Sequence, residues 1–264
     1  MRIAQVILPG ASAYERKSQR IDHAALAALH DVQVVPLEEV RSVRADLAHV
    51  YAPRELRPAD FAGFPLPYVS SAPLPQTRWS WRRPVAPRMV VDPFTLPEAV
   101  EEHFFEGSKW QPHERETKII GSFDRPAVRD MIQRTLARVE RFRSDVVWHL
   151  FEEPTPDNLL SVDIWADPAM DDLDYDGYVS EALVVGAPVV AARTPLNDLR
   201  LEKNRTGFLV PRNDPNEMTH AILTALFKQE VAEQKLVAAR QTVSKFRPRH
   251  RLRVLKTVYD NVKP

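Results

Sequence analysis

The sequence predicts an α/β fold with parallel sheets, divided into two domains. Three observations support this prediction. Short apolar runs alternate with helical patterns, the alternation starts afresh at Lys118, and 264 residues fit two small domains better than one. Hydrophobic residues make up 44% of the chain, which is enough for a sizeable core.

The first half reads as strand, helix and strand in succession. Apolar residues from Arg2 to Leu8 predict a buried strand, and apolar positions at helical spacing predict a helix from about Arg16 to Leu29. Further strands are predicted at 32–37, 46–51 and 66–69. This spacing is typical of parallel strands joined by crossover helices.

Segment 53–97 is rich in proline. It holds ten of the 23 prolines, and this density predicts irregular chain. Its stretch TRWSWRRP (77–84) has two interpretations: aromatic packing beside solvated arginines, or a surface for an acceptor or anionic ligand. A short helix is expected at 96–105, near a domain boundary.

The second half repeats the alternation. Strands are predicted at 118–121, 145–151, 162–166, 189–192 and 207–211. Helices are predicted at about 126–142, 178–185, 215–228 and 230–246, followed after Pro248 by a basic amphipathic helix. Asp214 and the proline after it form a helix-start signal.

Composition excludes several classes of protein. Lys and Arg (36) balance Asp and Glu (36), so we expect no nucleic-acid partner. The absence of cysteine excludes disulfides and thiolate metal sites and fits a reducing compartment. No apolar run approaches the roughly 20 residues of a membrane-spanning helix. We therefore expect a cytoplasmic protein without a transmembrane segment.

Common catalytic motifs are missing from the sequence. It contains no G-x-G-x-x-G, no P-loop, no H-E-x-x-H and no G-x-S-x-G. These absences remove support for a dinucleotide fingerprint, a zinc hydrolase and a serine hydrolase.

The stretch DGYVSEALVVGAPVVAAR (176–193) contains the clearest candidate site. Gly177 precedes the predicted helix 178–185, Gly186 stands where a left-handed cap is wanted, and a buried strand follows. Open amide groups at such a helix start attract an anion, and Glu181 can accept two hydrogen bonds from a vicinal diol such as ribose. In the alternative interpretation Glu181 only complements the helix dipole.

These residues resemble a family of enzymes. Residues 162–222 are similar to the nucleotide-sugar domain of retaining glycosyltransferases of the GT-B fold, family 4. The matches, in the family's order and spacing over about 60 residues, are Val162, Asp163, Pro168, Glu181, Ala182, Gly186, Pro188, Val189, Val190, Ala191, Thr206, Gly207, Leu209, Val210, Pro211, Asp214 and Pro215.

The resemblance implies two Rossmann-like domains facing a cleft, with an abbreviated N-terminal domain. Its implied boundaries are 1–105 for the acceptor-side domain, 106–246 for the nucleotide-sugar domain, and 247–264 for a helix packing back toward the first domain. It implies transfer of a sugar, of the hexosyltransferase type, from a nucleotide-diphosphate donor to an acceptor hydroxyl with retention. The implied partners are the nucleotide sugar and a glycan, lipid-linked or small-molecule acceptor; no separate cofactor or metal is implied, and a homo-oligomer stays open.

The resemblance also implies roles for single residues. Glu181 matches the family's ribose-binding glutamate, while the backbone of Tyr178, Val179 and Ser180, next to Gly177, would hold the diphosphate. Ser122 stands where the family has an arginine that assists the leaving group, so Arg125 is the substitute candidate, with Arg129 the other nearby cation. His49 matches a histidine near the donor sugar.

Several positions depart from the family pattern. Leu173 stands eight positions before Glu181, where the first glutamate of the family's motif belongs, and Asp176 precedes a glycine as that glutamate does, three residues later. We take Asp176 as the catalytic candidate there. Because of these departures, a catalytically silent nucleotide-binding partner protein is an alternative.

The same aspartates permit a third hypothesis. Asp172, Asp174, Asp176 and Gly177 match the front half of a calcium loop, but position 12 of that loop is Leu183, where a glutamate belongs. A calcium-dependent interaction module and a simple solvated acidic loop therefore remain as alternatives.

Overall fold

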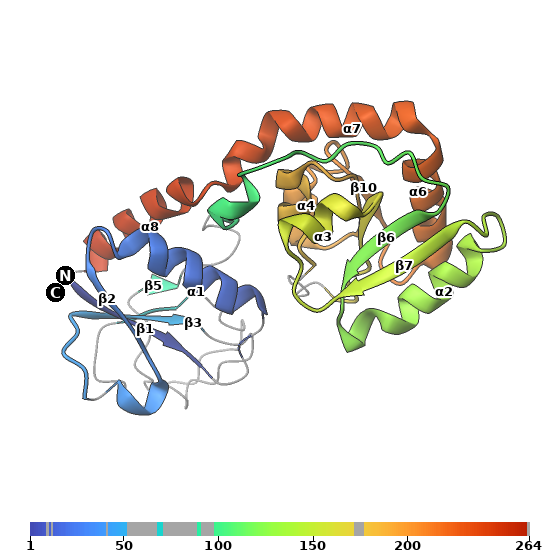
Figure 1. Ribbon diagram of the computed structural model, residues 1–264. Coiled ribbons are helices and arrows are strands. Elements are labelled where there is room, and N and C mark those ends of the chain that lie inside the picture. Colours follow the sequence, from blue (N-terminus) through green and yellow to red (C-terminus); the bar gives the residue numbers. More distant parts are fainter. Residues whose placement is uncertain are drawn as a thin grey trace. The chain divides into compact units, whose positions relative to one another are not determined.

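The computed structural model describes residues 1–8, 11, 13–40, 42–51, 68–70, 89–90, 98–171 and 177–262. The chain divides into two compact units, each built on one parallel five-stranded sheet (Figure 1). Unit 1 comprises Met1–Ala99 with Lys245–Pro264, and unit 2 comprises Val100–Ser244. The α/β fold with parallel sheets predicted from the sequence is confirmed.

The sheet of unit 1 has the strand order β2-β1-β3-β4-β5. Its strands are β1 (Arg2–Ile7), β2 (Asp31–Val35), β3 (Leu47–Tyr51), β4 (Tyr68–Ser70) and β5 (Met89–Val90). The prediction of irregular chain over 53–97 is wrong at β5, because a two-residue strand is too short to leave a periodic signal.

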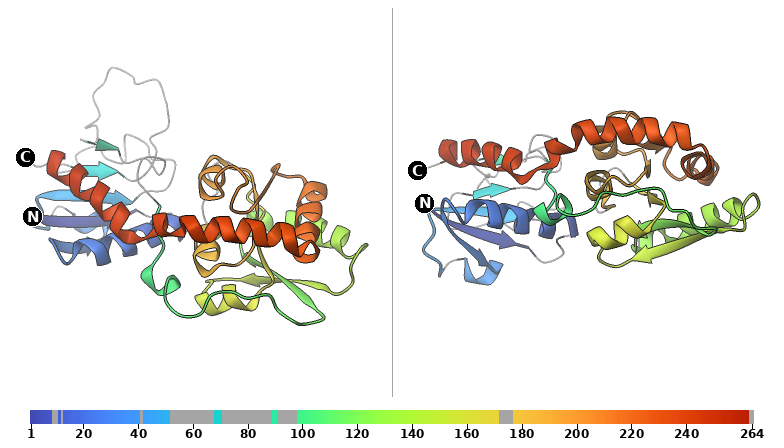
Figure 2. Two further views of the ribbon diagram at one scale, coloured as in Figure 1. Left: turned by 90° about the horizontal axis from the view of Figure 1, so that it is seen from above. Right: turned by 45° about the horizontal axis from the view of Figure 1, so that its top comes forward.

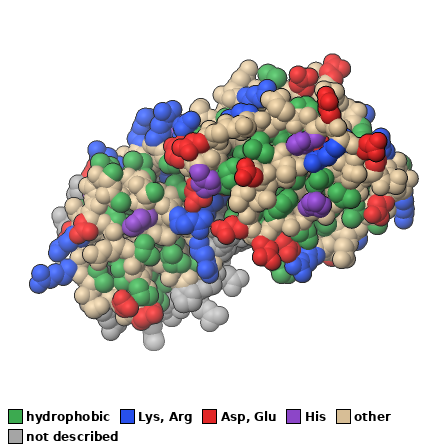
Figure 3. Space-filling view, in the orientation of Figure 1, with side chains coloured by type: hydrophobic (Ala, Val, Ile, Leu, Met, Phe, Trp, Pro, Cys, Tyr) green, Lys and Arg blue, Asp and Glu red, His purple; other side chains and the backbone are tan. Residues whose placement is uncertain are grey.

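Helices α1 (Ala13–Leu26) and α8 (Pro248–Val262) pack against each other in unit 1, although they come from opposite ends of the chain (Figure 2). Leu255, Val258 and Tyr259 of α8 share one core cluster with Ile3, Leu26 and Leu47. Arg249, Arg253 and Lys256 of α8 are exposed. Lys and Arg side chains are also visible on the surface of unit 1 in Figure 3. The basic amphipathic helix is therefore a packed helix with a solvated face.

The sheet of unit 2 has the order β10-β9-β8-β6-β7. Its strands are β6 (Lys118–Phe123), β7 (Val146–Phe151), β8 (Ile164–Asp167), β9 (Val189–Ala192) and β10 (Phe208–Val210). In chain order both sheets read second, first, third, fourth, fifth, the order of doubly wound folds. In such sheets successive strands are added first on one side of the first strand and then on the other, so the strand order reverses between the first and third strands. In unit 2 these are β6 and β8.

Helices flank this second sheet. They are α2 (Arg129–Val139), α3 (Pro156–Ser161), α4 (Val179–Val185), α5 (Pro195–Arg200), α6 (Pro215–Phe227) and α7 (Gln229–Thr242), with short 3₁₀ turns η4 (Pro126–Val128) and η5 (Val243–Phe246). The core cluster contains Ile120, Met131, Ile164, Val190, Met218 and Ile222, so strands from the middle of the sheet meet α2 and α6 there.

Two helices were missed by the sequence predictions, and one predicted helix differs from the structure. Helices α3 and α5 were not predicted; each has six residues and starts with a threonine cap followed by proline. The helix predicted at 96–105 is wrong in the part that the structure describes, where only the 3₁₀ turn Glu102–Phe104 forms and Glu101 has non-helical dihedrals, with φ of −58° and ψ of 140°. Among the described residues, no helix is long and apolar enough to cross a membrane.

Candidate active site

The carboxyl edge of the unit 2 sheet brings together most of the residues that the sequence singled out. Strand β6 ends at Phe123, β8 at Asp167 and β9 at Ala192, and all three strands are parallel. Doubly wound sheets bind ligands beyond the carboxyl ends of their strands, at the point where the strand order reverses. In unit 2 that point lies between β6 and β8.

A buried ion pair occupies this point. Arg125, two residues beyond β6, donates from Nη2 to Oδ1 of Asp167 over 2.6 Å, and the two side chains are 11% and 0% exposed. Charges withdrawn from water need a close partner, because desolvation of an isolated ion costs several kcal/mol. The sequence predicted Arg125 as the leaving-group cation and did not predict its carboxylate partner.

Asp167 has a second partner on the next helix. Asn197 of α5 donates from Nδ2 to Oδ2 of Asp167 over 2.9 Å and to the carbonyl of Ala192 over 3.0 Å. Arg200 in turn donates to Oδ1 of Asn197 over 3.1 Å and is 2% exposed. We call Arg125, Asp167, Asn197 and Arg200 the edge network.

The start of α4 packs directly against Asp167. A Cβ atom at Gly177 would lie 2.2 Å from Cγ of Asp167, so only glycine fits beside the carboxylate. The indole of Trp165 donates to the carbonyl of Gly177 over 2.7 Å. Tyr178 caps α4 in the left-handed conformation, with φ of 53°, and its ring lies 5.1 Å from that of Phe123. Gly177 therefore has a steric reason for being glycine, which the sequence alone did not reveal.

The first turn of α4 is buried. The sequence predicted open amide groups at this helix start, whereas Gly177 and Tyr178 are buried and Val179, Ser180 and Glu181 are each 0% exposed. A ligand that reaches Glu181 must therefore open this packing. The predicted contacts of 178–180 with a diphosphate, and of Glu181 with a ribose, remain predictions. The left-handed cap expected at Gly186 is present, with φ of 94°.

The neighbouring candidates on β6 and α2 differ in exposure. Ser122, where the resemblance expected an arginine, is buried; it donates to the carbonyl of Ala166 over 2.6 Å and accepts from Trp148 Nε1 over 2.9 Å. Arg129 is 55% exposed and pairs with Asp124 on the surface. Of the two candidate cations Arg125 and Arg129, only Arg125 is buried at the edge of the sheet.

His49 lies in unit 1, on β3, with no exposed surface. Its Nδ1 is 2.5 Å from the hydroxyl of Tyr259 and 3.0 Å from that of Tyr51. Burial lowers the pKa of His49 to about 4, so the ring is neutral at physiological pH. Contact between His49 and a donor sugar would require that this ring become exposed, and its catalytic role remains a prediction.

The acidic loop is not part of the described structure. Asp172, Leu173, Asp174 and Asp176 lie outside the described residues, so the catalytic prediction for Asp176 and the calcium-loop hypothesis remain as they were. Within the described ranges, no group of three or more His, Asp or Glu side chains is placed to hold a metal ion.

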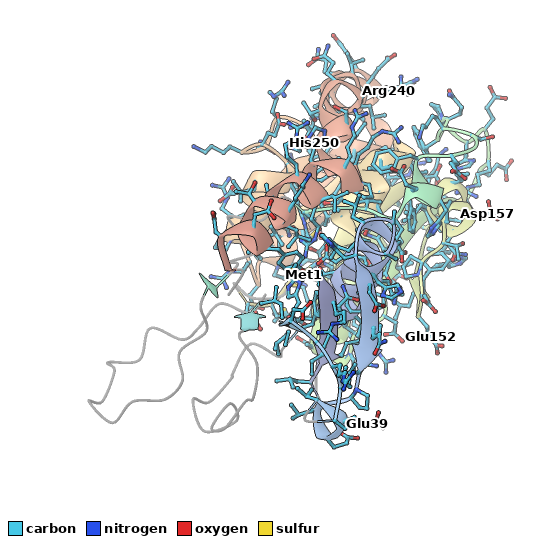
Figure 4. The ribbon with its side chains drawn as sticks, turned by 90° about the vertical axis from the view of Figure 1, so that its left-hand side faces the viewer. Met1, Glu39, Glu152, Asp157, Arg240 and His250 are labelled. Atoms are coloured by element: carbon cyan, nitrogen blue, oxygen red, sulfur yellow. The ribbon has the colours of Figure 1, made fainter. Side chains whose placement is uncertain are left out.

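A pocket of about 630 Å³ lies at the opposite, amino edge of the same sheet. Its lining includes Lys118, Asp163 and Pro188 near the strand starts and Ala232, Leu236 and Arg240 from α7. Figure 4 labels Arg240 on α7. This pocket is separate from the edge network and gives a second location against which ligand-binding experiments can be judged.

Among known proteins, this chain resembles solved structures but matches no protein-family model. No protein-family model matches the sequence, and no curated protein matches it significantly. Solved structures do match, and they share the GT-B architecture. A glycosyltransferase from Rickettsia africae ESF-5 aligns with a TM-score of 0.72 at 11% identity, over 99% of this chain and 98% of that one.

Two further matches extend over whole chains. Alr3699/HepE from Anabaena, solved in complex with UDP-glucose, aligns with a TM-score of 0.67 at 14% identity, covering 98% of this chain and 100% of that one. Sucrose-phosphate synthase from Thermosynechococcus elongatus aligns with a TM-score of 0.65 at 12% identity, covering 99% of each chain. At such identities the likeness is one of fold, and the predicted GT-B-like fold is confirmed.

Proposed function

We propose that the protein transfers a sugar from a nucleotide-diphosphate donor to an acceptor hydroxyl with retention of configuration. The observation that carries the proposal is the buried Arg125–Asp167 pair at the reversal point of the unit 2 sheet. The fold supports it, because the similar solved structures are of glycosyltransferases and one of them holds UDP-glucose.

Each candidate residue has a place in this proposal. The backbone of Tyr178, Val179 and Ser180 holds the diphosphate once the first turn of α4 opens, and Glu181 accepts hydrogen bonds from the ribose hydroxyls. Arg125 stabilises the negative charge that develops on the diphosphate as the bond from the anomeric carbon to its oxygen breaks. The acceptor oxygen then bonds to that carbon on the same face, and its proton passes to the departing diphosphate oxygen.

Asp176 and His49 complete the set of proposed catalytic residues, Asp176 beside the donor sugar and His49 from unit 1. The acceptor is a glycan, a lipid-linked sugar or a small molecule, which fits a role in the assembly of surface polysaccharide or glycoconjugates. The proposed enzyme is of the hexosyltransferase type, and the identity of its sugar and nucleotide base is left to experiment.

Thermal shift measurements test donor binding. We expect at least one of UDP, ADP, GDP and their hexose conjugates to raise the Tm of the wild-type protein, since a ligand that binds only the folded state stabilises it. Glu181→Ala and Glu181→Gln should both reduce this rise, because the ribose loses its carboxylate acceptor.

Glu217→Ala is the matched control for this experiment. Glu217 is exposed and occupies the third position of α6, as Glu181 occupies the third position of α4, so both substitutions remove the same helix-dipole interaction. Ligand-induced rises that are equal in wild type and both Glu181 variants would refute the ribose assignment.

A turnover assay separates transfer from binding alone. The departures at Leu173 and Ser122 favour a protein that binds the nucleotide without turnover as the second candidate function. Release of the nucleoside diphosphate from a bound donor, with or without acceptor, supports the enzyme. A donor that binds without any release supports the silent partner protein.

A further inference from the structure

The edge network places a negative charge where the proposed donor also brings negative charge. Asp167 is 1% exposed, and the start of α4, the proposed location of the diphosphate, is in steric contact with its carboxylate at Gly177. Like charges at such short range and in such a dry environment repel strongly. The presence of this carboxylate at the site therefore needs an explanation.

The geometry provides one through Arg125. With Nη2 on Oδ1 of Asp167 at 2.6 Å and a side chain only 11% exposed, the guanidinium has a counter-ion without any ligand. Removing one member of a buried ion pair leaves an uncompensated charge and costs about 3–5 kcal/mol of stability in other proteins. Asp167 thus allows a cation to be stored at the carboxyl edge of the sheet in the ligand-free protein.

Asp167 is itself held from two further sides. Asn197 donates to Oδ2 over 2.9 Å, and Gly177 leaves no room for the carboxylate to move toward α4. Arg200 fixes the amide of Asn197 by donating to its oxygen over 3.1 Å. The carboxylate therefore fixes the position of Arg125 as well as balancing its charge.

We propose that Asp167 is a positioning residue that stores Arg125 beside Gly177 and acts as its counter-ion until a nucleoside diphosphate takes over that charge. This inference rests on the proposed function, since it requires that a diphosphate bind at this edge. Its consequence is that Asp167 weakens diphosphate binding: the ligand must share or replace an existing partner of Arg125, and it meets a second negative charge.

Asp167→Asn tests this directly, because asparagine keeps the shape of the side chain and removes its charge. We expect the ligand-free variant to melt at a lower temperature than wild type. UDP should bind the variant about tenfold more tightly by isothermal titration calorimetry, equivalent to about 1.4 kcal/mol, and should raise its Tm by more than it raises that of wild type. A residue with a merely structural role would lower the Tm without tightening UDP binding.

Asp145→Asn is the matched control, because Asp145 pairs with Arg143 over 2.5 Å on the same unit but at the start of β7, at the other edge of the sheet. This control should bind UDP as wild type does. UDP binding to Asp167→Asn that is equal to or weaker than wild-type binding would overturn the proposal.

A double-mutant cycle keeps the test decisive if Asp167→Asn does not fold. In Arg125→Gln the carboxylate of Asp167 faces the site without its counter-ion, so UDP should bind this variant more weakly than it binds Arg125→Gln/Asp167→Asn. Equal affinities in these two variants would also overturn the proposal. If wild type binds none of UDP, ADP and GDP, the proposed function itself fails and takes this inference with it, an outcome distinct from wild-type binding that Asp167→Asn leaves unimproved.

Discussion

Among single residues, His49 has a pKa that burial in the fold shifts strongly. Its ring stacks on that of Tyr51 at a centroid distance of 4.2 Å. The hydroxyl of Tyr51 donates to Oδ2 of Asp22, and Nε of Arg251 on α8 donates to Oδ1 of the same carboxylate over 2.5 Å. Desolvation lowers the pKa of His49 to about 4, whereas an unfolded histidine titrates near 6.5. The folded state therefore binds fewer protons than the unfolded state between these two values.

This difference predicts a pH-dependent loss of stability. Because the unfolded state takes up the proton first as the pH falls, the free energy of unfolding should drop by about 2 kcal/mol between pH 7 and pH 5 from this residue alone. His49→Gln should lack this component while retaining hydrogen bonds to the tyrosines. Urea unfolding of both proteins at the two pH values measures the difference. Parallel losses in wild type and variant would show that His49 is not buried as described.

Helix α4 depends on glycine at both ends, for two different reasons. Gly186 ends the helix with a φ of 94°, a conformation that favours glycine, whereas Gly177 precedes the helix under steric pressure from Asp167. Only the first requirement leaves a signal in the sequence, through the Gly-Ala-Pro that follows an apolar helix. The second depends on β8, which lies about ten residues earlier in the chain.

Gly177→Ala therefore tests how tightly α4 and Asp167 are coupled. The added methyl group would lie 2.2 Å from Cγ of Asp167, so we expect a loss of about 1–3 kcal/mol from overpacking, together with weaker UDP binding because Arg125 moves with its partner. Gly107→Ala is the control: its Cβ would have no atom within 4 Å, and it is strained only by its φ of 79°. Equal losses of Tm and unchanged UDP binding in both variants would contradict the coupling.

The same distinction explains which elements the sequence predicted. The sequence predicted elements that have local signals. Strand β6 has an apolar run, and α6 has a cap in which Asp214 accepts from two backbone amides. Helices α3 and α5 are too short for periodicity, although Thr155 and Thr194 carry the threonine-proline start signal. In the edge network, Arg125 was found through its position after β6, while Asp167, Asn197 and Arg200 become one cluster only when β8 and α5 fold beside it.

At the scale of the whole molecule, unit 1 is discontinuous in sequence. Arg251 of α8 donates to both carboxylate oxygens of Asp22 on α1, with the side chains 3% and 1% exposed, and Leu255 and Tyr259 complete the core of unit 1. In the sequence, the segment that forms unit 2 is therefore inserted between the two segments that form unit 1. The doubly wound sheet occurs in both units, and the candidate site for the nucleotide belongs to unit 2 alone.

Hydrogen–deuterium exchange with and without UDP locates the donor site, since it follows backbone amides in both units in one experiment. We expect saturating UDP to slow amide exchange at 123–129 and 177–185, the segments of unit 2 that carry Arg125 and Glu181. Protection confined to the amino-edge pocket, at 110–114 and 229–240, or no change at 177–185 despite measured binding, would contradict it.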